Sequence, residues 1–296
     1  ARFSLSRRSA ARGAFAFLYP AGRAEKGMKT LYIDCGMGCA GDMLTGALLE
    51  LLPDGAGFLE RMNAALAGRA VISAAGVEKC GIRCTQVTVL IDGESEEADA
   101  HHHHHHGHHS HAGVKDIMAF IDSVELPEEV KCNVKAVYEL LARAEGSVHG
   151  RDIENIHFHE VGSIDALADV LSVCCLMHEL APERVVASAV NVGSGQVRCA
   201  HGLLPVPAPA TELLLRGVPV YSGAVQSELC TPTGAALLRR FVQDFGPMPL
   251  MRVAQAGYGA GKKDFEAANL VRVLLGESVA PEYLHGCAHS HPHAHE

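Results

Sequence analysis

Hydrophobic and polar positions follow two periodicities along the chain, one typical of strands and one of helices, and these predict strands alternating with helices. Runs rich in β-branched residues predict strands at 30–35, 71–74, 82–91, 185–192, 218–221, 252–256 and 270–275. Apolar residues at helical spacing predict helices at 40–52, 58–66, 117–121, 130–144, 164–180, 207–215 and 234–241. This order is typical of an α/β or α+β fold, so we expect a mixed sheet with packed helices.

Composition shifts divide the chain into five parts. We predict an N-terminal α/β segment at 28–91 and a main α/β domain at 114–276, joined by an acidic, histidine-rich linker at 92–113. A histidine-rich tail follows at 277–296. Residues 1–27 are basic and have the composition of a transit peptide. We favour the alternative that translation starts at Met28 and that the preceding residues are a misread upstream segment.

The overall composition narrows the classes of function. With 296 residues and 48% hydrophobic content, the chain can fill a substantial core, and no apolar run approaches the roughly 18 residues that a membrane helix requires. A net charge of −9 argues against nucleic acid as the main partner. Ten cysteines without a CxxC pair indicate buried thiols in a reducing compartment, so we expect a cytoplasmic protein.

The stretch at 156–169 combines two imidazoles with three carboxylates. An extended start would place His157 and His159 on one face, before Glu160 and a turn. The helix predicted at 164–180 is apolar nearly all round, except for a stripe that carries Asp165 and Asp169 four residues apart. Buried carboxylates need a positive partner, and a borderline divalent metal suits this mixed set of ligands. The alternative is structural histidines, with arginines pairing the aspartates.

A glycine loop follows the first predicted strand. Gly36, Gly38 and Gly41 fit the GxGxxG pattern, but no second parallel strand with a terminal acid follows at the required distance, which argues against a nicotinamide dinucleotide site. The carboxylates of Asp34 and Asp42 are better suited to a metal or a metal-nucleotide complex. A helix cap at Asp42 with a loop acid at Asp34 is the plain structural alternative.

Two histidine tracts predict metal handling. Clustered imidazoles in a flexible segment bind nickel, copper or zinc with little geometric selectivity, so a storage or delivery arm is a better interpretation than a rigid catalytic centre. The linker tract consists of His101, His102, His103, His104, His105 and His106, followed by His108, His109 and His111. The tail repeats the pattern with His285, Cys287, His289, His291, His293 and His295.

Two further patterns predict an anion site. Thr231, Thr233 and Gly234 precede a helix whose free backbone N–H groups would attract an anion, although the threonine can simply cap the helix. Lys262 and Lys263 end a glycine-rich run that lacks the GK[ST] ending of a phosphate-binding P-loop, and as a hairpin turn the run is unremarkable.

Several of these strings together resemble the LarC nickel-insertion family, over Met28 to about Gly276. The strings are DCGMGCAGDM at 34–43, VHG at 148–150, HFHEVG at 157–162, HG at 201–202, LPVPAPAT at 204–211, TPTGAA at 231–236 and GYGAG at 257–261, together with Asp165, Asp169 and the histidine linker.

The resemblance implies a reaction and its partners. It implies insertion of nickel into pyridinium-3,5-bisthiocarboxylic acid mononucleotide, with one nickel–carbon and two nickel–sulfur bonds, coupled to CTP hydrolysis with Mg or Mn. The product would serve lactate racemase or a similar apo-enzyme. In full-length members a further domain carries the CTP site, so we expect this chain to act with a CTP-binding C-terminal partner polypeptide, as a nickel chelatase or cyclometallase of the lyase class.

These expectations assign roles to the candidate residues as hypotheses. Glu160, Asp165 or Asp169 would take the ring proton, because forming a nickel–carbon bond requires its loss. His157 and His159 would bind nickel, and the anionic substrate would meet Thr231, Thr233, Gly234, Lys262 and Lys263. The alternative function is a non-catalytic metallochaperone that delivers nickel through its histidine arms.

Overall fold

The computed structural model describes residues 27–91, 94–95, 113–153, 156, 158, 162–199 and 202–279. Its helices are α1 (Gly41–Leu49), α2 (Gly55–Ala65), α3 (Val114–Ser123), α4 (Glu128–His149), α5 (Ile164–Leu180), α6 (Pro209–Leu214) and α7 (Pro232–Phe241). The longer strands are β1 (Lys29–Asp34), β2 (Val71–Lys79), β3 (Ile82–Ile91), β11 (Met251–Ala260) and β12 (Leu270–Ser278). The shorter ones are β4 (Glu94–Ser95), β5 (Arg184–Ala187), β6 (Val190–Asn191), β7 (Gln196–Cys199), β8 (Gly202–Pro205), β9 (Val220–Tyr221) and β10 (Asp244–Phe245).

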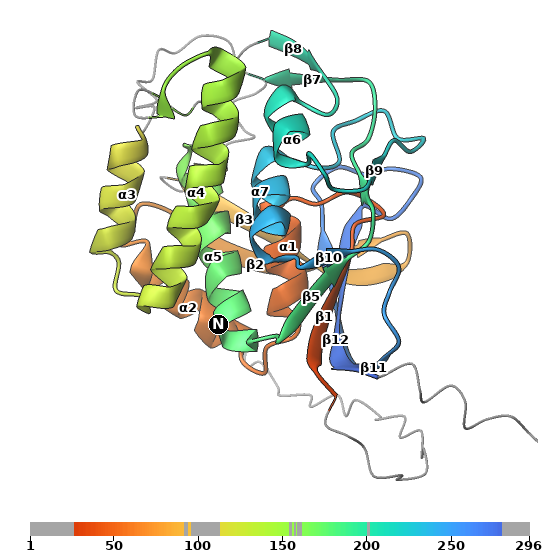
Figure 1. Ribbon diagram of the computed structural model, residues 1–296. Coiled ribbons are helices and arrows are strands. Elements are labelled where there is room, and N and C mark those ends of the chain that lie inside the picture. The colour runs from red at the N-terminus through yellow and green to blue at the C-terminus, as the bar shows by residue number, and fades with distance from the viewer. Residues whose placement is uncertain are drawn as a thin grey trace, which may run out of the picture.

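One mixed sheet of eight described strands organises the molecule. Its order is β10-β5-β1-β12-β11-β3-β2, with β4 paired to β3. Among the described residues β1 is the first strand and β12 the last; β1 runs antiparallel to β12 and parallel to β5 on its other side. The segments predicted at 28–91 and 114–276 therefore contribute to the same sheet. This confirms the mixed sheet with packed helices, and Figure 1 shows the helices gathered on one side of it.

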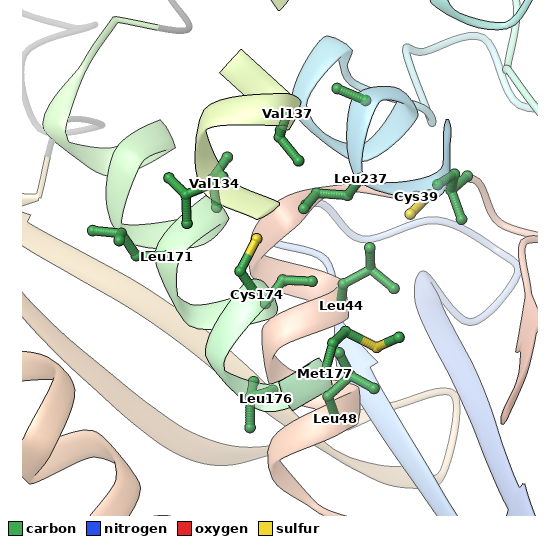
Figure 2. Packing of buried hydrophobic residues seen from close by; sticks show 14 of the residues in the cluster. Cys39, Leu44, Leu48, Val134, Val137, Leu171, Cys174, Leu176, Met177 and Leu237 are labelled. Atoms are coloured by element: carbon green, nitrogen blue, oxygen red, sulfur yellow. The ribbon is translucent and has the colours of Figure 1, made fainter. Parts of the chain in front are cut away.

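The core lies between the sheet and helices α1, α4, α5 and α7. Leu44 and Leu48 of α1, Leu171 and Met177 of α5 and Leu237 of α7 belong to one buried cluster, which Figure 2 shows from close by. Helix α5 is buried along nearly its whole length, as its apolar sequence predicts. Among the described residues, no helix combines the length and apolar character needed to cross a bilayer.

Helix α1 packs unusually closely on β11 because glycines remove the side chains between them. A Cβ at Gly259 would lie 1.7 Å from the carbonyl oxygen of Met43, and one at Gly257 would lie 2.0 Å from that of Ala47. These two glycines sit inside β11, and only residues 261–263 of the run lie in the connection between the antiparallel strands β11 and β12, so the predicted hairpin turn is confirmed for that end of the run alone. The role of the two glycines is to let a helix backbone rest on a strand.

Two predicted boundaries also need correction. The strand predicted at 185–192 is two strands, β5 and β6, because the chain leaves the sheet at Ser188. The Ser188 hydroxyl accepts a hydrogen bond from the Cys35 N–H at 2.9 Å and donates one to the Ala189 carbonyl. The tail predicted from residue 277 begins later, since Glu277 still pairs with Lys29 in the sheet.

Candidate functional site

A cavity of 490 Å³ opens where three helices begin. It is bounded by the first turns of α1, α5 and α7 and by the loop that follows β11. Backbone N–H groups in the first turn of a helix have no partner within the helix and carry partial positive charge. Three such starts around one cavity, with two lysines, favour a bound anion. The lining includes Ala40, Gly41, Asp42, Ser163, Asp165, Asp169, Glu228, Thr231, Thr233, Lys262, Lys263 and Asn269.

Two of the three helix starts have their own side-chain cap. Ser163 accepts a hydrogen bond from the Ala166 N–H at 3.2 Å at the start of α5. Thr231 accepts one from the Gly234 N–H at 3.2 Å at the start of α7. Each cap satisfies one N–H of its first turn, so the structural role expected of Thr231 is confirmed. A Cβ at Gly234 would lie 2.1 Å from the Cys39 carbonyl oxygen, so this glycine holds α7 against α1 instead of lining the cavity.

The start of α1 is capped from another helix. Ala40 occupies the N-cap position and provides no side-chain hydrogen bond. Instead, the carboxylate of Asp169 on α5 accepts a hydrogen bond from the backbone N–H of Asp42. Gly41 makes this approach possible, because a Cβ there would lie 2.5 Å from Oδ2 of Asp169. Asp42 is not the N-cap residue, but its own Oδ1 accepts a hydrogen bond from the Met43 N–H at 2.7 Å. The first turn of α1 is therefore capped both by Asp42 and by Asp169, a residue distant in the sequence.

Asp169 is an unusual carboxylate because it is only 8% exposed. Burial raises its pKa well above the usual value, and the neighbouring carboxylates of Asp42 and Asp165 raise the pKa further. The ammonium group of Lys262 and the N–H of Asp42 lower it. The positive partner expected for this acidic stripe is thus, within the described part of the chain, a lysine. A raised pKa makes Asp169 a better proton acceptor than an exposed aspartate.

The loop that carries Lys262 and Lys263, which we call the lysine loop, is anchored by a third lysine, Lys79. The Nζ atom of Lys79, whose residue is 8% exposed, donates to the carbonyl oxygens of Lys262 and Lys263 at 3.5 and 3.4 Å and to Asp264 at 2.5 Å. The Nδ2 atom of Asn269 donates to the Lys263 carbonyl at 2.8 Å. These contacts fix the backbone of the loop whose Lys262 and Lys263 line the cavity.

The structure brings together seven of the residues predicted from sequence. Asp42, Asp165, Asp169, Thr231, Thr233, Lys262 and Lys263 all line the same cavity. The side chain of Lys263 additionally donates to the Ser227 hydroxyl at 3.0 Å. Sequence reasoning missed Glu228 and Asn269. Neither stands in a recognisable pattern, although a buried asparagine directly before an apolar strand is a weak signal of a structural hydrogen bond.

Asp34 lies apart from this cavity. One oxygen of its carboxylate accepts from the Arg272 guanidinium at 2.6 Å, and the other accepts from the Gly36 N–H at 3.1 Å. Asp34 faces β12, whose Arg272 is its register partner, and it does not line the cavity. The structure therefore gives no support to Asp34 as a metal ligand, and the structural alternative describes it better.

The remaining predicted ligands cannot be placed. His157, His159 and Glu160 lie outside the described residues, as does the tract His101–His106. Phe158 between them is described: it is 1% exposed, and its ring meets the edge of Tyr138 at 5.8 Å between centroids. Within the described part of the chain, no three His, Cys, Asp or Glu side chains converge closely enough to hold a metal ion.

The comparison with known families is decisive. The family model described as nickel insertion protein matches residues 31–292. The chain belongs to the nickel insertion protein family. Family membership agrees with the resemblance noted from the sequence and with the metal handling that its histidine tracts indicate. No solved structure is a significant match for the chain.

Relatives in this family carry an explicit name. A Desulfitobacterium hafniense protein called pyridinium-3,5-bisthiocarboxylic acid mononucleotide nickel insertion protein is 43% identical over 252 residues, covering 84% of this chain and 59% of that protein. Proteins of the same name from Geobacillus kaustophilus and Staphylococcus epidermidis are 40% and 38% identical, over 85% and 84% of this chain and 61% and 60% of theirs. The chain thus spans about three fifths of the length of these curated relatives.

Proposed function

We propose that this chain binds pyridinium-3,5-bisthiocarboxylic acid mononucleotide and inserts nickel into it. The observation that carries the proposal is the cavity in which three helix starts, Lys262 and Lys263 meet the carboxylates of Asp42, Asp165 and Asp169. A mononucleotide of this kind offers a phosphate and two thiocarboxylates, which are anionic, and the reaction consumes a divalent cation. The cavity has groups of both signs for these two substrates.

The positive groups of the cavity would bind the anionic substrate. The phosphate fits the first turn of α7, where Thr233 lines the cavity and the helix dipole is positive, with Lys262 or Lys263 supplying a full charge. The lysine loop is anchored by Lys79 and Asn269, so binding needs little rearrangement. A prearranged set of donors lowers the entropic cost of fixing the substrate.

The carboxylates would interact with the metal ion and accept the ring proton. Nickel enters as a substrate and replaces a hydrogen on the pyridinium ring, so the ring carbon must lose a proton as the nickel–carbon bond forms. Asp169 is our candidate acceptor, because its raised pKa favours taking a proton and it lines the cavity. Glu160 and Asp165 remain candidate bases, and His157 and His159 remain candidate nickel ligands. Proton release to solvent through Asp42 and Asp165 would complete the step.

The finer features of the reaction belong to the same proposal. As the resemblance to the LarC family implies, we also propose that CTP and its Mg or Mn ion bind to a CTP-binding C-terminal partner polypeptide. CTP hydrolysis there would drive a cyclometallase reaction of the lyase class in this chain. The nickel-containing product would go to lactate racemase or a similar apo-enzyme, in the cytoplasm.

Binding of the mononucleotide by the full chain tests the anion site. Replacing Lys262 with Ala removes a charge-assisted interaction worth about 1.5–3 kcal/mol, so affinity should fall roughly tenfold or more. Lys115→Ala, in the exposed first turn of α3, is the matched control and should bind normally. Equal affinities for the two variants would show that the phosphate does not bind in this cavity.

An assay of nickel insertion distinguishes an enzyme from a metallochaperone that only delivers nickel. With nickel, mononucleotide, CTP, Mg²⁺ and the partner polypeptide present, Asp169→Asn should slow insertion while the mononucleotide still binds, because the amide cannot accept the ring proton. A metallochaperone would show no insertion at saturating nickel even with the unmodified chain. Replacing His157 and His159 with Ala tests the ligand assignment in the same assay, and unchanged turnover would reject it.

A further inference from the structure

Phe265 is the one phenylalanine among the described residues that takes no part in the core. The others belong to the main buried cluster or pack against it: Phe58, Phe120, Phe158, Phe241 and Phe245. Phe265 belongs to neither buried cluster, and it is half-buried in the lining of the cavity where α1, α5 and α7 begin. An aromatic ring held at a largely polar cavity is typical of a side chain that contacts a ligand.

The ring of Phe265 is available to a ligand. It is the only aromatic side chain among the described residues that line the cavity. The aromatic and cation–π contacts formed within the described part of the chain involve Phe58, Phe120 and Phe158, and none of them uses Phe265. The faces of its ring are therefore not occupied by another ring or by a cation from those residues.

The chain is anchored on both sides of Phe265 by the turn between β2 and β3. On one side, the Nζ atom of Lys79 donates to the carboxylate of Asp264 at 2.5 Å. On the other side, the thiol of Cys80 donates to the carbonyl oxygen of Glu266 at 3.4 Å. Phe265 is therefore presented from a stretch of the lysine loop that is already held, which lowers the entropic cost of binding a ligand against it.

The substrate of the proposed reaction carries a ring that matches this side chain. A pyridinium ring is flat, aromatic and positively charged, whereas the face of a phenylalanine ring carries partial negative charge. A cation placed over such a face is attracted to it, most strongly where water is excluded. Lys262 and Lys263 line the same cavity and would hold the anionic groups. The lysine loop thus offers one partner for the phosphate and another for the ring.

We propose that Phe265 is a specificity-determining residue of the cavity, on whose face the pyridinium ring of the substrate stacks. This inference rests on the proposed nickel insertion and adds which residue recognises the ring. A ring bound by its face leaves its edge free, and the edge carries the C–H bond that nickel replaces. Asp165 and Asp169 line the same cavity and would meet that edge. Phe265 would thereby distinguish a pyridinium mononucleotide from phosphorylated sugars that offer the same phosphate.

Binding of two ligands by the full chain tests the stacking. The ligands are pyridinium-3,5-bisthiocarboxylic acid mononucleotide and ribose 5-phosphate, which has the sugar and the phosphate but no ring. Phe265→Leu keeps an apolar side chain but removes the aromatic face, so the mononucleotide should bind about 2-fold to 30-fold more weakly. Ribose 5-phosphate should bind equally to both chains. Phe265→Trp offers a better face for a cation and should retain the affinity for the mononucleotide.

Phe245→Leu is the matched control. Phe245 is also half-buried, but it packs against the core and does not line the cavity. This variant should lose some thermal stability and bind both ligands normally. Thermal unfolding of each variant shows whether it is folded at the temperature of the binding measurement. If Phe265→Leu is not folded there, Phe265→Met provides a second replacement without an aromatic face.

Three results would overturn the assignment. Equal affinity of Phe265→Leu and the unmodified chain for the mononucleotide would show that the ring does not rest on Phe265. An equal loss of affinity for both ligands would show that the substitution acts on the phosphate contacts of the loop and not on the ring. Weaker binding of the mononucleotide by Phe265→Trp than by Phe265→Leu would exclude a contact between a cation and an aromatic face.

The insertion assay distinguishes a failure of this inference from a failure of the proposed function. If the unmodified chain inserts nickel and Phe265→Leu binds the mononucleotide normally, the stacking is wrong and the function stands. If the mononucleotide binds through Phe265 but nickel is never inserted, the function is wrong and the stacking stands. If the unmodified chain does not bind the mononucleotide, both are wrong.

Discussion

Replacing Gly41 with Ala is the sharpest test of how the cavity is assembled. The added Cβ would lie 2.5 Å from Oδ2 of Asp169 and 2.7 and 2.8 Å from its Cβ and Cγ, well inside ordinary van der Waals contact. Either α1 or α5 must shift, or Asp169 must turn away and leave the Asp42 N–H without its acceptor.

The size of the effect follows from these contacts. Overpacking of a buried position costs about 1–3 kcal/mol, and leaving a buried N–H without its hydrogen-bond acceptor costs about 1–3 kcal/mol. The two costs are alternatives, since a shift of Asp169 that relieves the overlap also breaks the bond. The gain in helix propensity from Gly to Ala offsets less than about 1 kcal/mol. We expect a net loss near 2 kcal/mol, or a fall in Tm of about 4–8 °C.

Gly55→Ala is a control at the equivalent position of another helix. Gly55 is the first residue of α2, as Gly41 is of α1, but the nearest atoms to its added Cβ belong to the flexible Leu49 side chain, at 3.3 Å. Thermal unfolding should place this variant within about 0.5 kcal/mol of the unmodified chain. Equal Tm values for the two alanine variants would show that Asp169 does not rest against α1, and the account of the cavity would be wrong.

Three further predictions follow from single residues. The raised pKa of Asp169 means that the folded chain keeps a proton that the unfolded chain loses near 3.8, so stability falls as pH rises through the folded pKa; Asp169→Asn should flatten this decline and stabilise the chain at pH 8 in thermal unfolding. Asp34→Asn should leave nickel insertion unchanged and cost at most about 1 kcal/mol, because its ion pair with Arg272 is partly exposed. Leu171→Ala, at a fully buried core position, should cost about 2–5 kcal/mol in denaturant unfolding, and a smaller loss would indicate a collapsible site.

Local sequence predicted the elements well wherever the signal was itself local. Helix α5 begins and ends as predicted, at residues 164 and 180, because Ser163 provides a cap and the apolar run that follows is continuous. Strand β11 was predicted too short, since Gly257 and Gly259 look like turn residues until the backbone of α1 is seen against them. Glycine marks both a turn and a close approach, and the sequence does not distinguish these uses.

The candidate site depends on contacts that are distant in sequence. The acidic stripe on α5 could be predicted from Asp165 and Asp169, but its position beside Gly41 could not. That position requires β1 to pair with both β5 and β12, which brings helix starts near residues 41, 164 and 232 to one place. Patterns within a short window carry no information on such pairings. These pairings also bring Lys262 near Asp169. The charges of the two residues alone did not predict that they would lie together.

The pairing of β1 with β12 also constrains how the molecule can be made. Strand β1 lies between β5 and β12, so during synthesis it must wait for residues 184–187 and then for 270–278 before its two edges are filled. Contacts with such long sequence separation form slowly. Until β12 emerges from the ribosome, a nascent chain would expose an open β edge, and polypeptides released before residue 270 should therefore be prone to aggregation or degradation.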